Sequence, residues 1–114
     1  MSGETPGEFH REFDEIEALL SKAFVSVEKR EKPLQKALEV SNRLRRRVER
    51  CWTYCVGKKK PGKLEEHYRD GADRVNWIYD EIERLLDQED LRGEAVLLEA
   101  VNYTRDKLAK RPEL

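Results

Sequence analysis

The stretch Leu44–Tyr68, LRRRVERCWTYCVGKKKPGKLEEHY, contains the end of one predicted helix, a turn and the start of another. Before the turn, apolar residues recur at spacings of three and four, which is typical of the buried face of an α-helix. Val56-Gly57 followed by Pro61-Gly62 is the strongest turn signal in the chain, because glycine and proline both interrupt helices. The stretch therefore predicts a helical hairpin.

The same three-and-four spacing continues in both directions and forms four apolar stripes, each of which predicts the buried face of one helix. A capping-box pattern at Thr5–Glu8 predicts the start of the first helix, and the fourth is expected over about residues 93–110. In chain order, the stripes are Phe9, Phe13, Ile16, Leu20, Ala23 and Val27; Leu34, Ala37, Ser41, Leu44, Val48, Cys51 and Cys55; Leu64, Tyr68, Gly71, Val75, Ile78, Ile82 and Leu85; and Leu97, Val101, Thr104 and Leu108.

Four stripes separated by breaks predict an all-α fold, an antiparallel four-helix bundle built from two αα-hairpins. The break at Pro33 is less marked, since the heptad phase runs from Val27 to Leu34 without a shift. The alternative is a long kinked helix that pairs with a second copy in a dimeric bundle. Gly71 predicts either a weak point in its helix or the close approach of a neighbouring backbone. We expect one helical domain over residues 1–114, with flexible ends at 1–5 and 111–114.

Charge is segregated along the chain. Residues 43–63 hold nine Lys or Arg and one acid, residues 1–42 hold six basic and nine acidic side chains, and residues 64–114 hold eight and fourteen. The formal net charge is −1, which argues against a protein that coats nucleic acid with its whole surface. We expect a local surface for an anionic partner, formed by Arg43, Arg46, Arg47, Arg50, Lys58, Lys59, Lys60 and Lys63.

Other interpretations of this basic segment remain open. Its arginines can cover neighbouring helices or pair with acids of the third helix, such as Glu65, Glu66 and Asp70. Trp52 and Tyr54 resemble the aromatic residues of a base-stacking surface, although Trp52 adjoins the apolar stripe and is expected to pack inside. Two clusters, at 45–47 and 58–60, also match the spacing of a bipartite nuclear localisation signal.

Two carboxylate pairs are candidate metal ligands, Asp14 with Glu17 and Asp80 with Glu83. Paired acids on helices can hold magnesium for phosphate chemistry, provided that they converge inside the bundle. Helical geometry instead points these side chains away from the apolar stripes, so we expect solvated surfaces.

The two cysteines are a second candidate site. Cys51, Cys55, His67 and Asp70 could bind zinc across the turn, although structural zinc sites prefer Cys and His to Asp. Both cysteines lie on an apolar stripe, so we expect them to pack in the core as small apolar groups.

No phosphate-binding loop, Ser-His-Asp set, dinucleotide fingerprint or long apolar run occurs in the sequence. We therefore expect a non-enzymatic protein without cofactor or metal. We expect it inside the cell, in the cytoplasm rather than the nucleus, and not bound to a membrane. The expected function is that of a helical interaction module, an adaptor or a self-assembling subunit, whose partner is another protein or a second copy. The alternatives are a nucleic-acid-binding protein that uses residues 43–63 and a metal-dependent phosphohydrolase that uses the carboxylate pairs.

Overall fold

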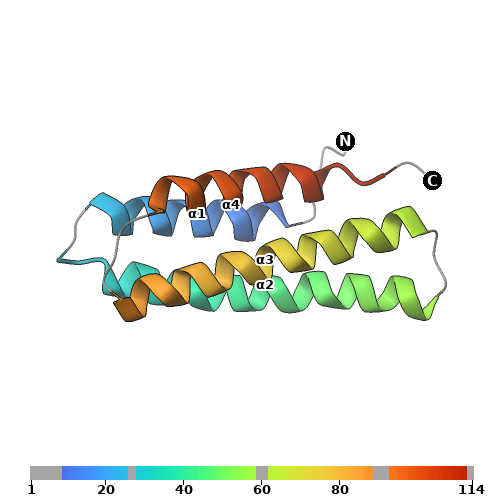
Figure 1. Ribbon diagram of the computed structural model, residues 1–114, viewed down its shortest axis with the longest axis horizontal. Helices are drawn as coiled ribbons and strands as arrows, with labels where there is room; N and C mark the ends of the chain where they lie inside the picture. The colour runs from blue at the N-terminus through green and yellow to red at the C-terminus, as the bar shows by residue number, and fades with distance from the viewer. Residues whose placement is uncertain (1–8, 26–27, 59–61, 89–92, 113–114) are drawn as a thin grey trace.

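The computed structural model describes residues 9–25, 28–58, 62–88 and 93–112, and these ranges contain four α-helices and no strand. The helices are α1 (His10–Val25), α2 (Glu31–Gly57), α3 (Gly62–Gln88) and α4 (Glu94–Ala109). α1 packs against α2 and α4, and α3 packs against the same two helices. Consecutive helices run in opposite directions along the long axis (Figure 1). The predicted four-helix bundle is confirmed.

The apolar stripes form the core of this bundle. Every stripe residue that the structure describes is buried, except that Cys51 is half-buried. Val40 and Ala72 are also buried, although neither lies on the stripe of its helix. The buried arc of α2 and that of α3 are therefore wider than a single stripe.

The connection between α1 and α2 decides between the two predicted topologies. α1 ends at Val25 and α2 begins at Glu31, so Pro33 is the third residue of α2 rather than the end of the preceding helix. Proline fits in a first turn because the amides there have no partner within the helix. The alternative of one long kinked helix is wrong, since the stripes of α1 and α2 meet in one core. The predicted helix start at Thr5–Glu8 and the stripe residue Val27 lie outside the described residues.

The helices differ in length. α2 and α3 have 27 residues each, whereas α1 and α4 have 16 each. At 1.5 Å per residue the long pair spans about 40 Å and the short pair about 24 Å. The α2–α3 hairpin therefore extends past the ends of α1 and α4 near the turn that joins α2 to α3 (Figure 1). We call this end, residues 51–58 and 62–67, the hairpin tip.

Charged side chains connect each pair of neighbouring helices at its edge. Such pairs are partly exposed and contribute little to stability individually, but they show which flank of a helix faces which neighbour. The contacts are Arg47 with Glu12 between α2 and α1, Arg45 with the ring of Tyr79 between α2 and α3, Lys107 with Asp70 between α4 and α3, and Arg105 with Asp14 and Glu17 between α4 and α1.

Candidate interaction surface

Three arginines of the predicted basic surface lie along the outward face of α2. Arg43, Arg46 and Arg50 are separated by three and four residues, which places them in one row opposite the buried stripe. All three are exposed, and none forms an ion pair within the part of the chain that the structure describes. We call Arg43, Arg46 and Arg50 the basic row.

The two arginines that flank this row, Arg45 and Arg47, contact residues of neighbouring helices. The guanidinium of Arg45 lies 4.5 Å from the centre of the Tyr79 ring and donates a hydrogen bond to Asn42 Oδ1 at 2.6 Å. Arg47 pairs with Glu12 and lies 5.1 Å from the centre of the Phe9 ring. Successive helical residues differ by about 100° in direction, so three consecutive arginines face α3, solvent and α1 in turn.

Arg47 is placed differently from the three arginines of the basic row. We expected Arg47 on the surface for an anionic partner, but it is half-buried and its guanidinium already has a carboxylate partner and a ring contact. Of the two interpretations left open for these arginines, contact with neighbouring helices fits Arg45 and Arg47, and the acid that pairs with Arg47 lies on α1. Asp70 instead pairs with Arg74 and Lys107.

A shallow groove of about 510 Å³ runs beside the basic row, and all of its lining residues come from α2. Arg46, Glu49, Arg50, Thr53 and Tyr54 line it. Tyr54 is 57% exposed, whereas tyrosine is intermediate in burial in folded proteins. The groove therefore combines two guanidinium groups, one carboxylate and an accessible aromatic ring.

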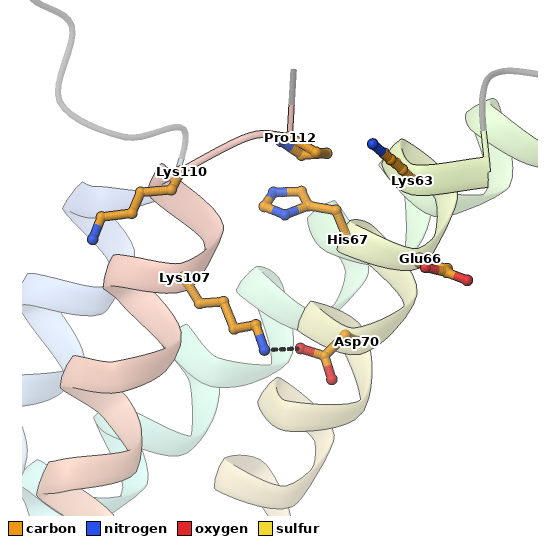
Figure 2. Close-up of a pocket in the computed structure, with 7 residues that line it drawn as sticks. All are labelled: Lys63, Glu66, His67, Asp70, Lys107, Lys110 and Pro112. Carbon is orange, nitrogen blue, oxygen red and sulfur yellow. Dashed lines mark ion pairs between the residues drawn. The ribbon is translucent and has the colours of Figure 1, made fainter. Parts of the chain in front are cut away.

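The lysines of the predicted surface do not all join the basic row. Lys58 follows the last residue of α2, and its Nζ lies 5.9 Å from the centre of the Tyr54 ring. Lys59 and Lys60 lie outside the described residues. Lys63 belongs to α3 and lines a different pocket, which is shown in Figure 2. The basic segment of the sequence is thus divided between two places on the bundle.

The second pocket lies between α3 and the end of α4 and has a volume of about 480 Å³. Its lining is mixed in charge, with three lysines, two acids, one histidine and Pro112 (Figure 2). Asp70 receives a hydrogen bond from Arg74 Nε at 2.9 Å, and Lys107 Nζ lies 3.4 Å from the same carboxylate. Partial burial raises the pKa of Asp70, but Arg74 and Lys107 outweigh this effect and bring the pKa below its ordinary value.

The candidate metal ligands are placed as follows. Cys55 is buried and Cys51 is half-buried. Among the described residues, no three or more His, Cys, Asp or Glu side chains are grouped so that they could share a metal ion. Cys51 and His67 each have contacts of their own within the fold.

The two carboxylate pairs lie apart from each other. Asp14 and Glu17 both contact Arg105 Nη1, at 2.8 Å and 3.7 Å, between α1 and α4. Asp80 and Glu83 are exposed on α3. α1 does not contact α3 within the described ranges, so the bundle does not bring the two pairs together.

The structure also reveals a row on α3 that the sequence analysis did not single out. Asp73, Asp80 and Asp87 recur every seven residues on the outward face of α3, and we call them the acidic row. Trp77 lies between the first two and is 43% exposed. The signal in the sequence was that three like charges recur every seven residues opposite the apolar stripe of the same helix. This pattern can be recognised once the stripe is known.

Comparison of the chain with protein-family models, with curated proteins and with solved structures found no match. Within the described ranges, no helix combines the length and the apolar character needed to cross a membrane.

Proposed function

We propose that this protein is a non-enzymatic helical-bundle interaction module that binds an acidic protein helix along the basic row of α2. The supporting observation is that these three arginines are exposed and without ion pairs among the described residues, whereas Arg45 and Arg47 beside them are engaged within the bundle. Exposed charges contribute little to folding, so the stability of the bundle does not account for the row.

The composition of this face supports a protein partner. Arginine and tyrosine are enriched among the residues that contribute most to protein–protein binding, and Tyr54 presents its ring beside Arg50. The row is straight and rises about 10 Å from Arg43 to Arg50. Carboxylates with the same spacing on a partner helix can therefore meet all three guanidinium groups at once.

A nucleic acid is the second candidate partner, and the exposed ring of Tyr54 is the observation that favours it. An aromatic ring next to cationic side chains can stack on an unpaired base while the cations contact phosphates. Glu49 in the groove and the acidic row on the neighbouring helix α3 oppose a long polyanion. We therefore place the protein partner first.

The test is a fluorescence-anisotropy titration with three labelled probes: a helical peptide with Glu at i, i+3 and i+7, the same peptide with Gln, and a single-stranded oligonucleotide. The glutamate peptide should bind, and its affinity should fall as salt is raised. The variant Arg43→Ala/Arg46→Ala/Arg50→Ala should lose this binding. The matched control Arg11→Ala/Lys22→Ala/Lys29→Ala removes three exposed cations elsewhere and should bind as the wild type does.

Each other outcome is informative. Equal binding of the glutamate and glutamine peptides, or equal losses in the two triple variants, would overturn the proposal that the basic row is the contact. Tighter binding of the oligonucleotide than of the glutamate peptide, lost in the basic-row variant alone, would assign the surface to nucleic acid.

A further inference from the structure

We infer that the partner of the basic row is a second copy of this chain, which docks its own acidic row there. The inference rests on the proposed function, because it names the occupant of the same surface. Asp73, Asp80 and Asp87 are exposed, and none forms an ion pair within the described part of the chain. Within the described residues, a basic row and an acidic row without ion pairs therefore lie on two helices of equal length.

The two rows have matching spacing. Seven residues separate Arg43 from Arg50, and seven separate Asp73 from Asp80, so each pair spans about 10 Å along its helix. If the helices run antiparallel, Arg43 meets Asp80 and Arg50 meets Asp73.

The residues between these charges also match. In the same antiparallel register Arg46 meets Trp77, which is 43% exposed. A guanidinium over an indole ring is a favourable cation–π contact, and tryptophan is the best of the aromatic side chains for it. Trp77 is thus covered by a cation that has no other partner among the described residues.

The match continues beyond the central three positions. Towards the turn between α2 and α3 the register places Tyr54 opposite Arg69, again a ring and an exposed guanidinium. In the other direction it places Lys36 opposite Asp87. No pair of like charges occurs among these five positions, and like charges across a helix interface would oppose association.

The bundle itself provides this register. Within one chain α2 and α3 are antiparallel neighbours, and the contact between Arg45 and Tyr79 shows that these two positions stand at the same height. Arg46 is therefore level with about Trp77 in its own chain. A twofold axis parallel to the bundle leaves every height unchanged, so it can bring α2 of one copy against α3 of the other in this register. The contact is isologous and forms twice, as in most soluble dimers.

The first measurement is the molar mass by light scattering or sedimentation at several protein and salt concentrations. At about 50 mM salt the wild type should approach twice the chain mass of 13.5 kDa, and it should dissociate as salt rises to about 500 mM. Reversal of one row, either Arg43→Glu/Arg50→Glu or Asp73→Arg/Asp80→Arg, should weaken association by about tenfold or more. The control Arg11→Glu/Lys29→Glu should dimerise as the wild type does.

The decisive experiment mixes the two reversed variants. A homodimer of either reversed variant would place like charges against each other at both contacts. The mixed dimer has opposite charges at both contacts. The mixture, and the chain that carries all four substitutions, should therefore regain the dimer mass. Circular dichroism of each variant verifies that the helices are intact.

Three results would overturn the inference: a wild type that stays at 13.5 kDa at low salt, a dimer that survives both row reversals, or a mixture that does not regain the dimer. If the wild type is monomeric but still binds the glutamate peptide through the basic row, the inference fails and the proposed function stands. If neither association nor peptide binding depends on the row, both fail.

Discussion

Gly71 in α3 leaves room for a side chain of α4. A Cβ atom added at Gly71 would lie 2.5 Å from Cδ2 of Leu108, 3.1 Å from its Cγ and 3.2 Å from its Cδ1. The sequence left two explanations for this glycine open, a weak point in the helix or the close approach of a neighbouring backbone, and the close neighbour is instead the end of a leucine side chain. Leu108 is only 2% exposed, so it has little space into which to move.

We predict that Gly71→Ala destabilises the protein. Alanine improves helix propensity by about 1 kcal/mol, whereas overpacking of a core costs about 1–3 kcal/mol. Urea unfolding followed by circular dichroism should therefore show a lower free energy of unfolding. In the background Leu108→Ala the same substitution should stabilise instead, because its steric partner is gone. The same sign in both backgrounds would show that Leu108 is not the reason for glycine here.

Asp70 links α3 to α4 through Lys107, and Arg74 lowers its pKa as well. A carboxylate whose pKa is lower in the folded state stabilises the fold above its unfolded pKa, about 4, and this stabilisation is lost as pH falls through the folded pKa. The side chain is 42% exposed, so the contribution at neutral pH is below about 1 kcal/mol.

We predict that Asp70→Asn lowers the free energy of unfolding slightly at pH 7, and that the difference from wild type disappears as pH falls below about 4 and through the lowered pKa of Asp70. Urea unfolding at several pH values measures it. A difference that is constant across this range would mean that the Asp70 charge does not contribute, and that asparagine acts through packing alone.

At the scale of the helix, the start of α4 depends on one residue with a left-handed backbone. Gly93 precedes α4 with φ of 92° and ψ of 4°, and no side chain caps the helix at this point. The nearest atom to an added Cβ is Arg84 Nη2 at 3.6 Å, which is an ordinary contact. The constraint at Gly93 is therefore conformational, not steric crowding from a neighbouring helix.

We predict that Gly93→Ala lowers the free energy of unfolding by about 1–2 kcal/mol, the cost of a left-handed conformation for a residue with a Cβ. Gly93→Asn should cost less, because asparagine tolerates this conformation and caps helices well. Thermal unfolding of the two variants provides the comparison. Equal losses for alanine and asparagine would contradict this explanation.

The sequence predicted the helices themselves well but placed one boundary wrongly. The spacing of apolar residues predicts the buried face of each helix. Ile16, Leu44, Ile78 and Val101 are all fully or almost fully buried. Pro33 was expected to end or kink a helix, yet α2 begins two residues before it. A proline is compatible both with the end of one helix and with the first turn of the next. The heptad phase continues without a shift across the break, so it could not distinguish these two positions.

At the scale of the whole molecule, unequal helix lengths create the hairpin tip. The middle parts of α2 and α3 are covered on one side by α1 and α4, whereas the tip extends past the ends of these two helices (Figure 1). Segments with fewer packed neighbours open locally at lower free energy.

We predict that amides in the tip at residues 52–57 and 63–66 exchange with deuterium about tenfold or more faster than those at residues 75–85 of α3. Hydrogen exchange measured by mass spectrometry at neutral pH tests this in the unmodified protein. Residues 40–48 of α2 are the internal control, because they belong to the same helix as part of the tip. Uniform protection along both helices would show that the tip is as stable as the enclosed part.

The charged surface was predictable only in part. Helical spacing alone placed Arg43, Arg46 and Arg50 opposite the apolar stripe, and the structure has them exposed there. Helical spacing could not show whether Arg47 is exposed or paired, because it places this side chain only on the flank of the row. Whether a flanking side chain meets solvent or an acid depends on the neighbouring helix, and here Glu12 of α1 meets it.

The sequence alone was sufficient for the four helices, their buried faces and the four-helix bundle, because backbone hydrogen bonds are local and apolar spacing is a property of one helix at a time. Only the tertiary structure decided which helices are neighbours, which arginines are engaged, and that Lys63 and Arg46 lie in separate pockets. These features join residues far apart in the chain, for example Arg47 with Glu12 and Leu108 with Gly71. Their partners are set by the packing of complete helices, which the spacing within one helix does not specify.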